Sequence, residues 1–234
     1  MPPSDLESVT RIPPAPGGES GAPASPPSFF LVESGSGGEG FRRVFRAEYR
    51  DGETLRLTHA ANLPKSVQNI EGTAAYRVGE RVMLLFAERG ERELEARISW
   101  AEINPQGNSG ELKPQPGAGQ SFRLPGLAGP TARQISDLSV DSRGWVYVAS
   151  TLDPGDAGPF RSQVWRMGWL TVGRSGALSL VVSPEPQLVA QVDGFKVEAL
   201  ATRELPDGRR QLFIGTDDEW YGGALRLLGA LPDD

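Results

Sequence analysis

The residues most able to do chemistry in this chain are carboxylates that recur about every sixty residues. Glu71, Asp137 and Glu198 occupy corresponding places, within one position, in three similar segments. If these segments converge, their carboxylates supply the oxygen ligands that calcium or another hard cation takes. A carboxylate lining a channel must be hydrated, paired or bound to metal, because burying it alone is costly. We therefore predict a calcium site, with Asp217 and Asp218 as further ligands.

The peptide GTDDEWYGG at 215–223 adds a second kind of chemistry to the same end of the chain. Glu219, Trp220 and Tyr221 follow the two aspartates, so oxygen ligands would stand beside an aromatic wall that suits a ring-shaped ligand. Comparable loops carry more acids, at Glu39, Glu88, Glu91, Asp153 and Asp156. The alternative is that these acids and glycines are ordinary turn residues with solvated charges, and that the aromatic pair covers a sheet edge.

Other common chemistries lack their residues. The chain has no cysteine and one histidine, His59, which disfavours a thiolate site, a zinc site and a Ser-His-Asp triad. GSGGEG at 35–40 has no following helix or Lys-Ser/Thr pair, so it fails as a phosphate loop. The net charge of -6 opposes nucleic acid and anionic membrane, and it favours a solvated strand over phosphate binding for the arginines of 41–50.

The elements that position these acids are predicted to be short strands. Apolar runs alternate with Gly, Pro, Asp and Asn from residue 29 onwards. IEGTAAYR at 70, ISDLSVDS at 135 and VEALATRE at 197 are each followed by a turn and a more apolar run, and then by a third strand. The Glu- and Ala-rich stretch 91–104 is assigned as a strand, because its apolar residues alternate strictly with polar ones.

This repeat predicts an all-β fold, a small or incomplete β-propeller of four-stranded blades of about 60 residues. The first strand of each copy carries small residues, which suits the crowded centre of a propeller. The second is apolar without alternation, which suits a strand packed on both faces. The alternative is a β-sandwich with similar hairpins.

The repeat count is compatible with more than one number of blades. Two units are complete, the C-terminal unit stops after its third strand, and the N-terminal unit lacks its first. A compact four-bladed ring, an open array completed by a partner chain and a shortened relative of a longer propeller all fit this count.

The remaining segments are predicted from composition. Residues 1–27 hold eight of the 20 prolines and few large apolar groups, so we expect a disordered Pro-rich tail before a domain at 28–234. Residues 103–120 are expected to form a long exposed loop. The chain shows no signal peptide and no membrane span, which favours a cytoplasmic location, although the absence of cysteine is compatible with export too.

The segments VEALA, IEGTA and SDLSVDSRGWVYVAS, with LFIGTDDEWYGG near the end, resemble the β-propeller group of esterase-like phytase domains and SdiA-regulated proteins. The resemblance covers residues 28–228 and implies a propeller with channel-facing acids at Glu71, Asp137 and Glu198 that bind calcium. It does not imply phosphatase activity, because the chain is too short for the full ring of such enzymes and has no dense basic pocket.

Together these patterns predict a binding or scaffolding module that uses an acidic face, with a structural calcium ion and a protein or small-molecule ligand. The alternative is a metal-dependent phosphoesterase or lactonase-like hydrolase that holds activated water with the same acids. A third reading is a structural subunit whose open blade edge pairs with another copy. Neither nucleic acid nor membrane is an expected partner.

Overall fold

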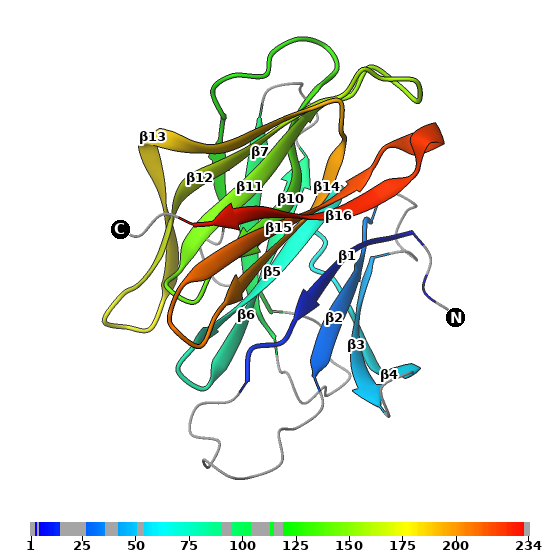
Figure 1. Ribbon diagram of the computed structural model, residues 1–234. Coiled ribbons are helices and arrows are strands. Elements are labelled where there is room, and N and C mark those ends of the chain that lie inside the picture. The colour runs from blue at the N-terminus through cyan, green and yellow to red at the C-terminus, as the bar shows by residue number, and fades with distance from the viewer. Residues whose placement is uncertain are drawn as a thin grey trace.

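The protein is a four-bladed β-propeller. The computed structural model describes residues 3, 5–14, 27–35, 42–50, 54–89, 95–103, 113–114 and 119–231. Within these residues the strands form four antiparallel sheets, which we number as blades 1 to 4 (Figure 1). The innermost strands β1, β5, β10 and β14 lie next to one another in that order, so each blade follows its neighbour around a common centre.

The strand bounds follow the predicted repeat closely. Blade 1 contains β1 (Leu6–Arg11), β2 (Ser28–Glu33), β3 (Arg43–Arg50) and β4 (Thr54–Asn62). Blade 2 contains β5 (Ile70–Val78), β6 (Arg81–Arg89), β7 (Ala96–Ile103), β8 (Lys113–Pro114) and β9 (Gln120–Phe122). Blade 3 contains β10 (Ala132–Val140), β11 (Trp145–Leu152), β12 (Arg161–Val172) and β13 (Leu178–Asp193). Blade 4 contains β14 (Val197–Glu204), β15 (Arg210–Asp217) and β16 (Gly223–Ala230), with the short 3-10 turn η2 (Glu219–Tyr221).

The N-terminal segment corrects one expectation. Residues 1–27 were predicted to be a disordered tail, but Leu6–Arg11 form β1 and pair antiparallel with β2. β1 also binds blade 2, because the hydroxyl of Ser8 accepts a hydrogen bond from the backbone N–H of Thr73 at 2.8 Å. Blade 1 therefore has the first strand that the sequence analysis found missing. Residues 15–26 lie outside the described part of the chain.

The structure also bears on the strand predicted at 91–104 and on the loop predicted at 103–120. The strand predicted within 91–104 is confirmed as β7 over Ala96–Ile103. The loop predicted at 103–120 contains β8, which pairs with the end of β7, and β9 starts at its last residue; positions 104–112 and 115–118 are outside the described residues. No helix among the described residues is long and apolar enough to cross a membrane.

The hydrophobic core lies between blades. Among the described residues, three clusters of buried apolar side chains join blade 1 to 2, blade 2 to 3, and blade 3 to 4. The central strand β6 is packed on both faces, and its residues from Val82 to Ala87 have no exposed surface. The second strands of blades 2 and 3, β6 and β11, are buried continuously, which explains why they are apolar without alternation.

Gly72 marks the closest approach of two inner strands. A Cβ atom at this position would lie 2.7 Å from the backbone nitrogen of Leu138 and 2.8 Å from the Cα of Asp137 in β10. Because neither atom can rotate away, β5 and β10 would have to separate. Small residues on the first strand of each repeat are thus a packing requirement.

We expect Gly72→Ala to lower the free energy of unfolding by roughly 1–3 kcal/mol, the usual cost of forcing extra atoms into a packed interface. Denaturant unfolding of the two proteins measures this difference. Gly173→Ala is the matched control, because a Cβ there meets nothing closer than 3.7 Å. Equal losses for the two variants would contradict the proposed contact.

Candidate functional site

Three glutamates occupy the same position in three different blades. Glu7, Glu71 and Glu198 each lie at a register shift near the start of the innermost strand, between its first and third residues. In blade 3 the corresponding residue is Ser136, and Asp137 follows it. Sequence analysis missed Glu7 because the segment had been assigned to the tail. The signal was present, since LESV at 6–9 matches IEGT at 70 and VEAL at 197.

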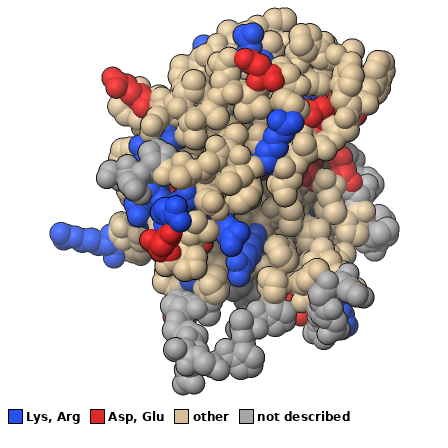
Figure 2. Space-filling model, viewed as in Figure 1, with Lys and Arg blue, Asp and Glu red and all other residues tan. Residues whose placement is uncertain are grey.

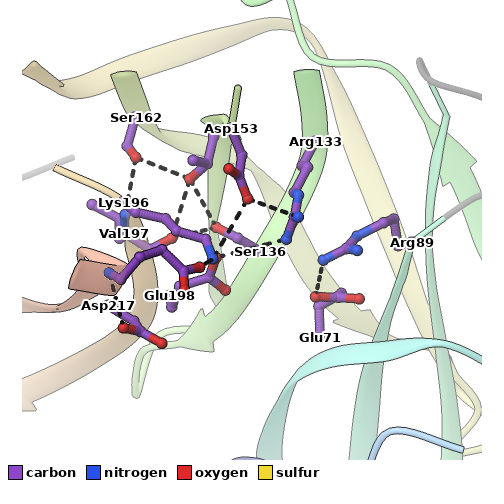
Figure 3. Close-up of polar contacts among 12 residues, drawn as sticks. Glu71, Arg89, Arg133, Ser136, Asp153, Ser162, Lys196, Val197, Glu198 and Asp217 are labelled. Carbon is purple, nitrogen blue, oxygen red and sulfur yellow. Dashed lines mark hydrogen bonds and ion pairs between the residues drawn. The ribbon is translucent and has the colours of Figure 1, made fainter. Parts of the chain in front are cut away.

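Lys196 lies at the centre of the charged groups that surround these glutamates. Its ammonium group is 3.5 Å from Asp153 and 3.4 Å from Glu198 (Figure 3). It also binds the carboxylate of Glu219. Burial lowers the pKa of Lys196, but the hydrogen bond to Glu219 and the nearby carboxylates raise it further, so the net shift is upward. Lys196 therefore stays charged while its side chain is 8% exposed.

Arg133 joins this network, and Arg89 forms a second ion pair inside blade 2. Arg133 is 2.7 Å from Asp153 and 4.0 Å from Glu198, and Arg89 pairs with Glu71 (Figure 3). We call the whole set the ionic cluster; its members are Glu7, Glu71, Arg89, Arg133, Asp153, Lys196, Glu198 and Glu219. It contains five acids and three bases, so this site carries mixed charge with an excess of acids. The side of the protein in Figure 2 likewise carries basic as well as acidic side chains.

The pKa values of three glutamates of the cluster, Glu7, Glu71 and Glu198, are raised. Burial raises the pKa of Glu71 to about 7, an effect that Arg89 opposes and that the charges of Glu7 and Glu198 reinforce. Burial also raises the pKa of Glu198, against the influence of Lys196 and Arg133. The pKa of Glu7 is raised by desolvation and by the charge of Asp5. These carboxyl groups therefore exchange protons closer to neutral pH than free glutamates do.

The carboxylate of Asp137 is not part of the ionic cluster. Its side chain is buried, and its Oδ2 accepts a hydrogen bond from the backbone N–H of Leu200 in blade 4. The backbone N–H of Leu138 binds it as well, while burial raises its pKa. Asp137 thus joins the inner strands of blades 3 and 4 through a backbone hydrogen bond.

The acids of the 215–223 peptide also divide into different roles. Asp218 accepts hydrogen bonds from the backbone N–H of Lys196 at 2.7 Å and from the hydroxyl of Thr216 at 2.8 Å, which fixes the turn before η2. Asp217 is exposed and accepts a longer bond, 3.3 Å, from the backbone N–H of Glu219. Of the three acids, only Glu219 places its side chain in the ionic cluster, and the rings of the next two residues, Trp220 and Tyr221, are exposed.

The predicted calcium ligands are consequently not gathered in one place. In the part of the chain that the structure describes, no group of three or more Asp, Glu or His side chains has the arrangement of a metal site. Of the loop acids, Asp153 belongs to the ionic cluster and Glu88 binds Ser99 and the backbone of Gln68. Glu39 and Glu91 lie outside the described residues. Two arginines of β3 form ion pairs: Arg43 pairs with Glu33, and Arg46 with Glu48.

The fold and these side chains define a class: a four-bladed β-propeller with a cluster of mixed charge where the inner strands of its blades begin. No family model and no curated protein matches the chain. Similar solved structures include an endo-arabinase from Bacteroides thetaiotaomicron, with 13% identity, a TM-score of 0.46 and coverage of 88% of this chain and 75% of that one. An exo-1,5-α-L-arabinanase from a bovine ruminal metagenomic library gives 12% identity, a TM-score of 0.44 and coverage of 89% and 70%. An α-L-arabinofuranosidase from Podospora anserina gives 12%, 0.40, 96% and 70%. At these values no residue and no activity is transferred.

Proposed function

We propose that the protein is a binding module whose ionic cluster, together with Trp220 and Tyr221, takes an uncharged ring compound rich in hydroxyl groups, in chemical terms a carbohydrate. A hydroxyl group both donates and accepts hydrogen bonds, so it is best met by donors and acceptors side by side. The cluster offers this pattern, because Lys196 and Arg133 stand between the carboxylates of Asp153 and Glu198.

The observation that carries the proposal is that Glu219, a member of this cluster, is followed directly in the chain by two aromatic residues. Glu219 pairs with Lys196, and the next two residues, Trp220 and Tyr221, are 76% and 73% exposed. Flat aromatic faces beside a few converging polar groups are typical of sites for ring-shaped ligands. The three bases of the cluster offset three of its five carboxyl groups, and burial raises the pKa of Glu7, Glu71 and Glu198, which reduces the remaining negative charge and favours a neutral ligand over an ionic one.

Titration calorimetry with a panel of neutral mono- and oligosaccharides tests this proposal. We expect one class of sugar to bind, and Trp220→Ala to weaken that binding at least tenfold because the ring supplies most of the apolar contact. Leu188→Ala is the matched control, since it removes an exposed apolar side chain from β13. Binding that survives in Trp220→Ala, or no binding to any sugar, would overturn the proposal.

Hydrolysis at the same site is the second candidate, favoured by the pKa of Glu71 near 7. A carboxyl group of this kind is partly protonated at neutral pH and can serve as a general acid, with an ionised neighbour as its partner. A screen of nitrophenyl glycosides, phosphate monoesters and lactones, with and without a chelator, separates binding from hydrolysis. It also tests the metal-dependent phosphoesterase or lactonase predicted from the sequence.

Calcium binding, the cytoplasmic location and the resemblance to esterase-like phytase and SdiA-regulated propellers stay predictions of the sequence. For calcium, the measurement is the melting temperature with calcium and with chelator, in the wild type and in Glu71→Gln and Glu198→Gln. A rise of several degrees that both variants lose would support a structural ion held by these acids.

A further inference from the structure

The sheet of blade 4 ends one strand earlier than the other sheets. In blades 1 to 3 a fourth strand pairs antiparallel with the third: β4 pairs with β3, β9 with β7, and β13 with β12. Within the described residues, blade 4 has three strands and ends at β16 (Figure 1). An edge strand directs the backbone N–H and C=O groups of alternate residues away from its own sheet. β16 therefore offers a hydrogen-bonding edge eight residues long.

β16 is exposed where its counterparts are buried. The third strands of blades 2 and 3, β7 and β12, consist mainly of buried residues. No residue of β16 is buried, and Leu225 and Leu227 are 79% and 51% exposed. These two leucines share one face of the strand, because they are two positions apart. A long edge strand with exposed apolar side chains is a strand that another strand can join.

Blade 1 shows what a fourth strand brings to such an edge. On one face of its sheet, Leu57 of β4 lies opposite Ala47 of β3. On the other face, Arg56 of β4 lies opposite Glu48 of β3. Apolar pairs and pairs of opposite charge that face each other across two strands both stabilise a sheet. β4 thus supplies leucine on one face and, on the other, a charge opposite to that of Glu48.

Arg226 defines the charge that a fourth strand of blade 4 should carry. It lies between the two leucines in sequence, so its side chain is on the opposite face of β16. The side chain is exposed, its guanidinium lies 4.0 Å from the centroid of the Phe195 ring, and no ion pair among the described residues includes it. A strand that completes blade 4 as β4 completes blade 1 would place apolar residues beside the leucines and a carboxylate opposite Arg226.

We propose that β16 binds an extended peptide of a partner molecule, which adds a fourth strand to blade 4 and carries a carboxylate between two apolar residues. Backbone hydrogen bonds along the edge supply affinity, and the alternation of side chains supplies specificity. A second copy of β16 does not fit this description, because its sequence, GALRLLGA, has no acid and would bring a like charge to Arg226. The inference goes beyond the proposed ligand site and does not depend on it.

Fluorescence anisotropy with two labelled peptides tests this inference. One peptide is the β4 sequence, TLRLTHAAN, and the other is the same sequence with Arg56→Glu. We expect the glutamate peptide to bind the wild-type protein about fivefold more tightly than the arginine peptide, the effect of one cross-strand charge pair. The protein variant Arg226→Glu should reverse this preference. Arg174→Glu, which changes an exposed arginine in the turn between β12 and β13, is the matched control and should leave the preference unchanged.

Three results of this experiment would overturn the proposal. The first is that neither peptide binds, and the second is that both bind equally well. The third is that Arg226→Glu leaves the preference as it is in the wild type, which would mean that the peptides bind at another place, such as the edge of β3 after exchange with β4.

Methylation of the peptide backbone shows whether the glutamate peptide binds as a strand. It is made in two forms, N-methylated at the odd or at the even residues. Only one edge of the peptide faces β16, so one form should lose binding and the other should keep it. Equal binding of the two forms contradicts strand addition. A wild type that is a dimer by light scattering and excludes the peptide also overturns the proposal, since a second copy would then occupy β16.

Discussion

Replacing Asp141 by alanine is expected to lower the free energy of unfolding by about 3–5 kcal/mol, the range seen when one partner of a buried ion pair is removed. Its Oδ2 lies 2.5 Å from the guanidinium of Arg210 and accepts a hydrogen bond from the hydroxyl of Tyr147 at 3.2 Å. Its Oδ1 accepts backbone N–H bonds from Arg143 and Trp145, so the same side chain holds the turn between β10 and β11. The substitution would remove the carboxylate that pairs with Arg210, a side chain buried between blades 3 and 4 with 2% of its surface exposed.

Equilibrium denaturation in urea measures this loss. Asp193→Ala is the matched control, because its pair with Arg161 has a similar separation, 3.1 Å, but is exposed; we expect that loss to stay below about 1 kcal/mol. The double variant Asp141→Ala/Arg210→Met should be more stable than the sum of its single variants predicts, since it leaves no buried charge. If Asp141→Ala costs no more than Asp193→Ala, the pair does not hold blade 4 in place.

The strands could be predicted from the sequence because each carries its own local signal. The alternation around Ile98 identified β7 despite its helix-forming composition, and the apolar run of β6 identified a strand packed on both faces. β1 was missed because the prolines around it dominate the composition of residues 1–27. The pairing that stabilises β1 comes from β2 and from Thr73, both distant in the sequence, and no local pattern records it.

The candidate site was predictable only for its acids. Glu71 and Glu198 were found because a repeated strand places equivalent residues in equivalent positions. The bases come from positions that do not repeat: Arg89 ends β6, Arg133 is near the start of β10, and Lys196 precedes β14. Long flexible side chains bring them to the acids, and no repeated pattern in the sequence records this.

We expect Glu71 to make the stability of the protein depend on pH. With a pKa near 7 in the folded state and about 4.5 in the unfolded chain, Glu71 binds a proton more tightly when the protein is folded. Its contribution to stability is therefore fully present below about pH 4.5 and is lost as the pH rises through 7. Since one pKa unit corresponds to about 1.4 kcal/mol, the loss amounts to roughly 3 kcal/mol by pH 8.

Glu71→Gln removes this dependence, because glutamine resembles the protonated acid and cannot ionise. Relative to the wild type, the variant should gain stability steadily between pH 4.5 and 8, as thermal or urea unfolding across that range would show. Glu102→Gln is the control. It measures how much stability changes when one exposed carboxylate paired with an arginine is lost. If Glu71→Gln instead becomes the less stable protein at pH 8, then the pair with Arg89 outweighs the burial of the carboxylate. The cluster would then hold a fully ionised acid, and Glu71 could not serve as a proton donor at neutral pH.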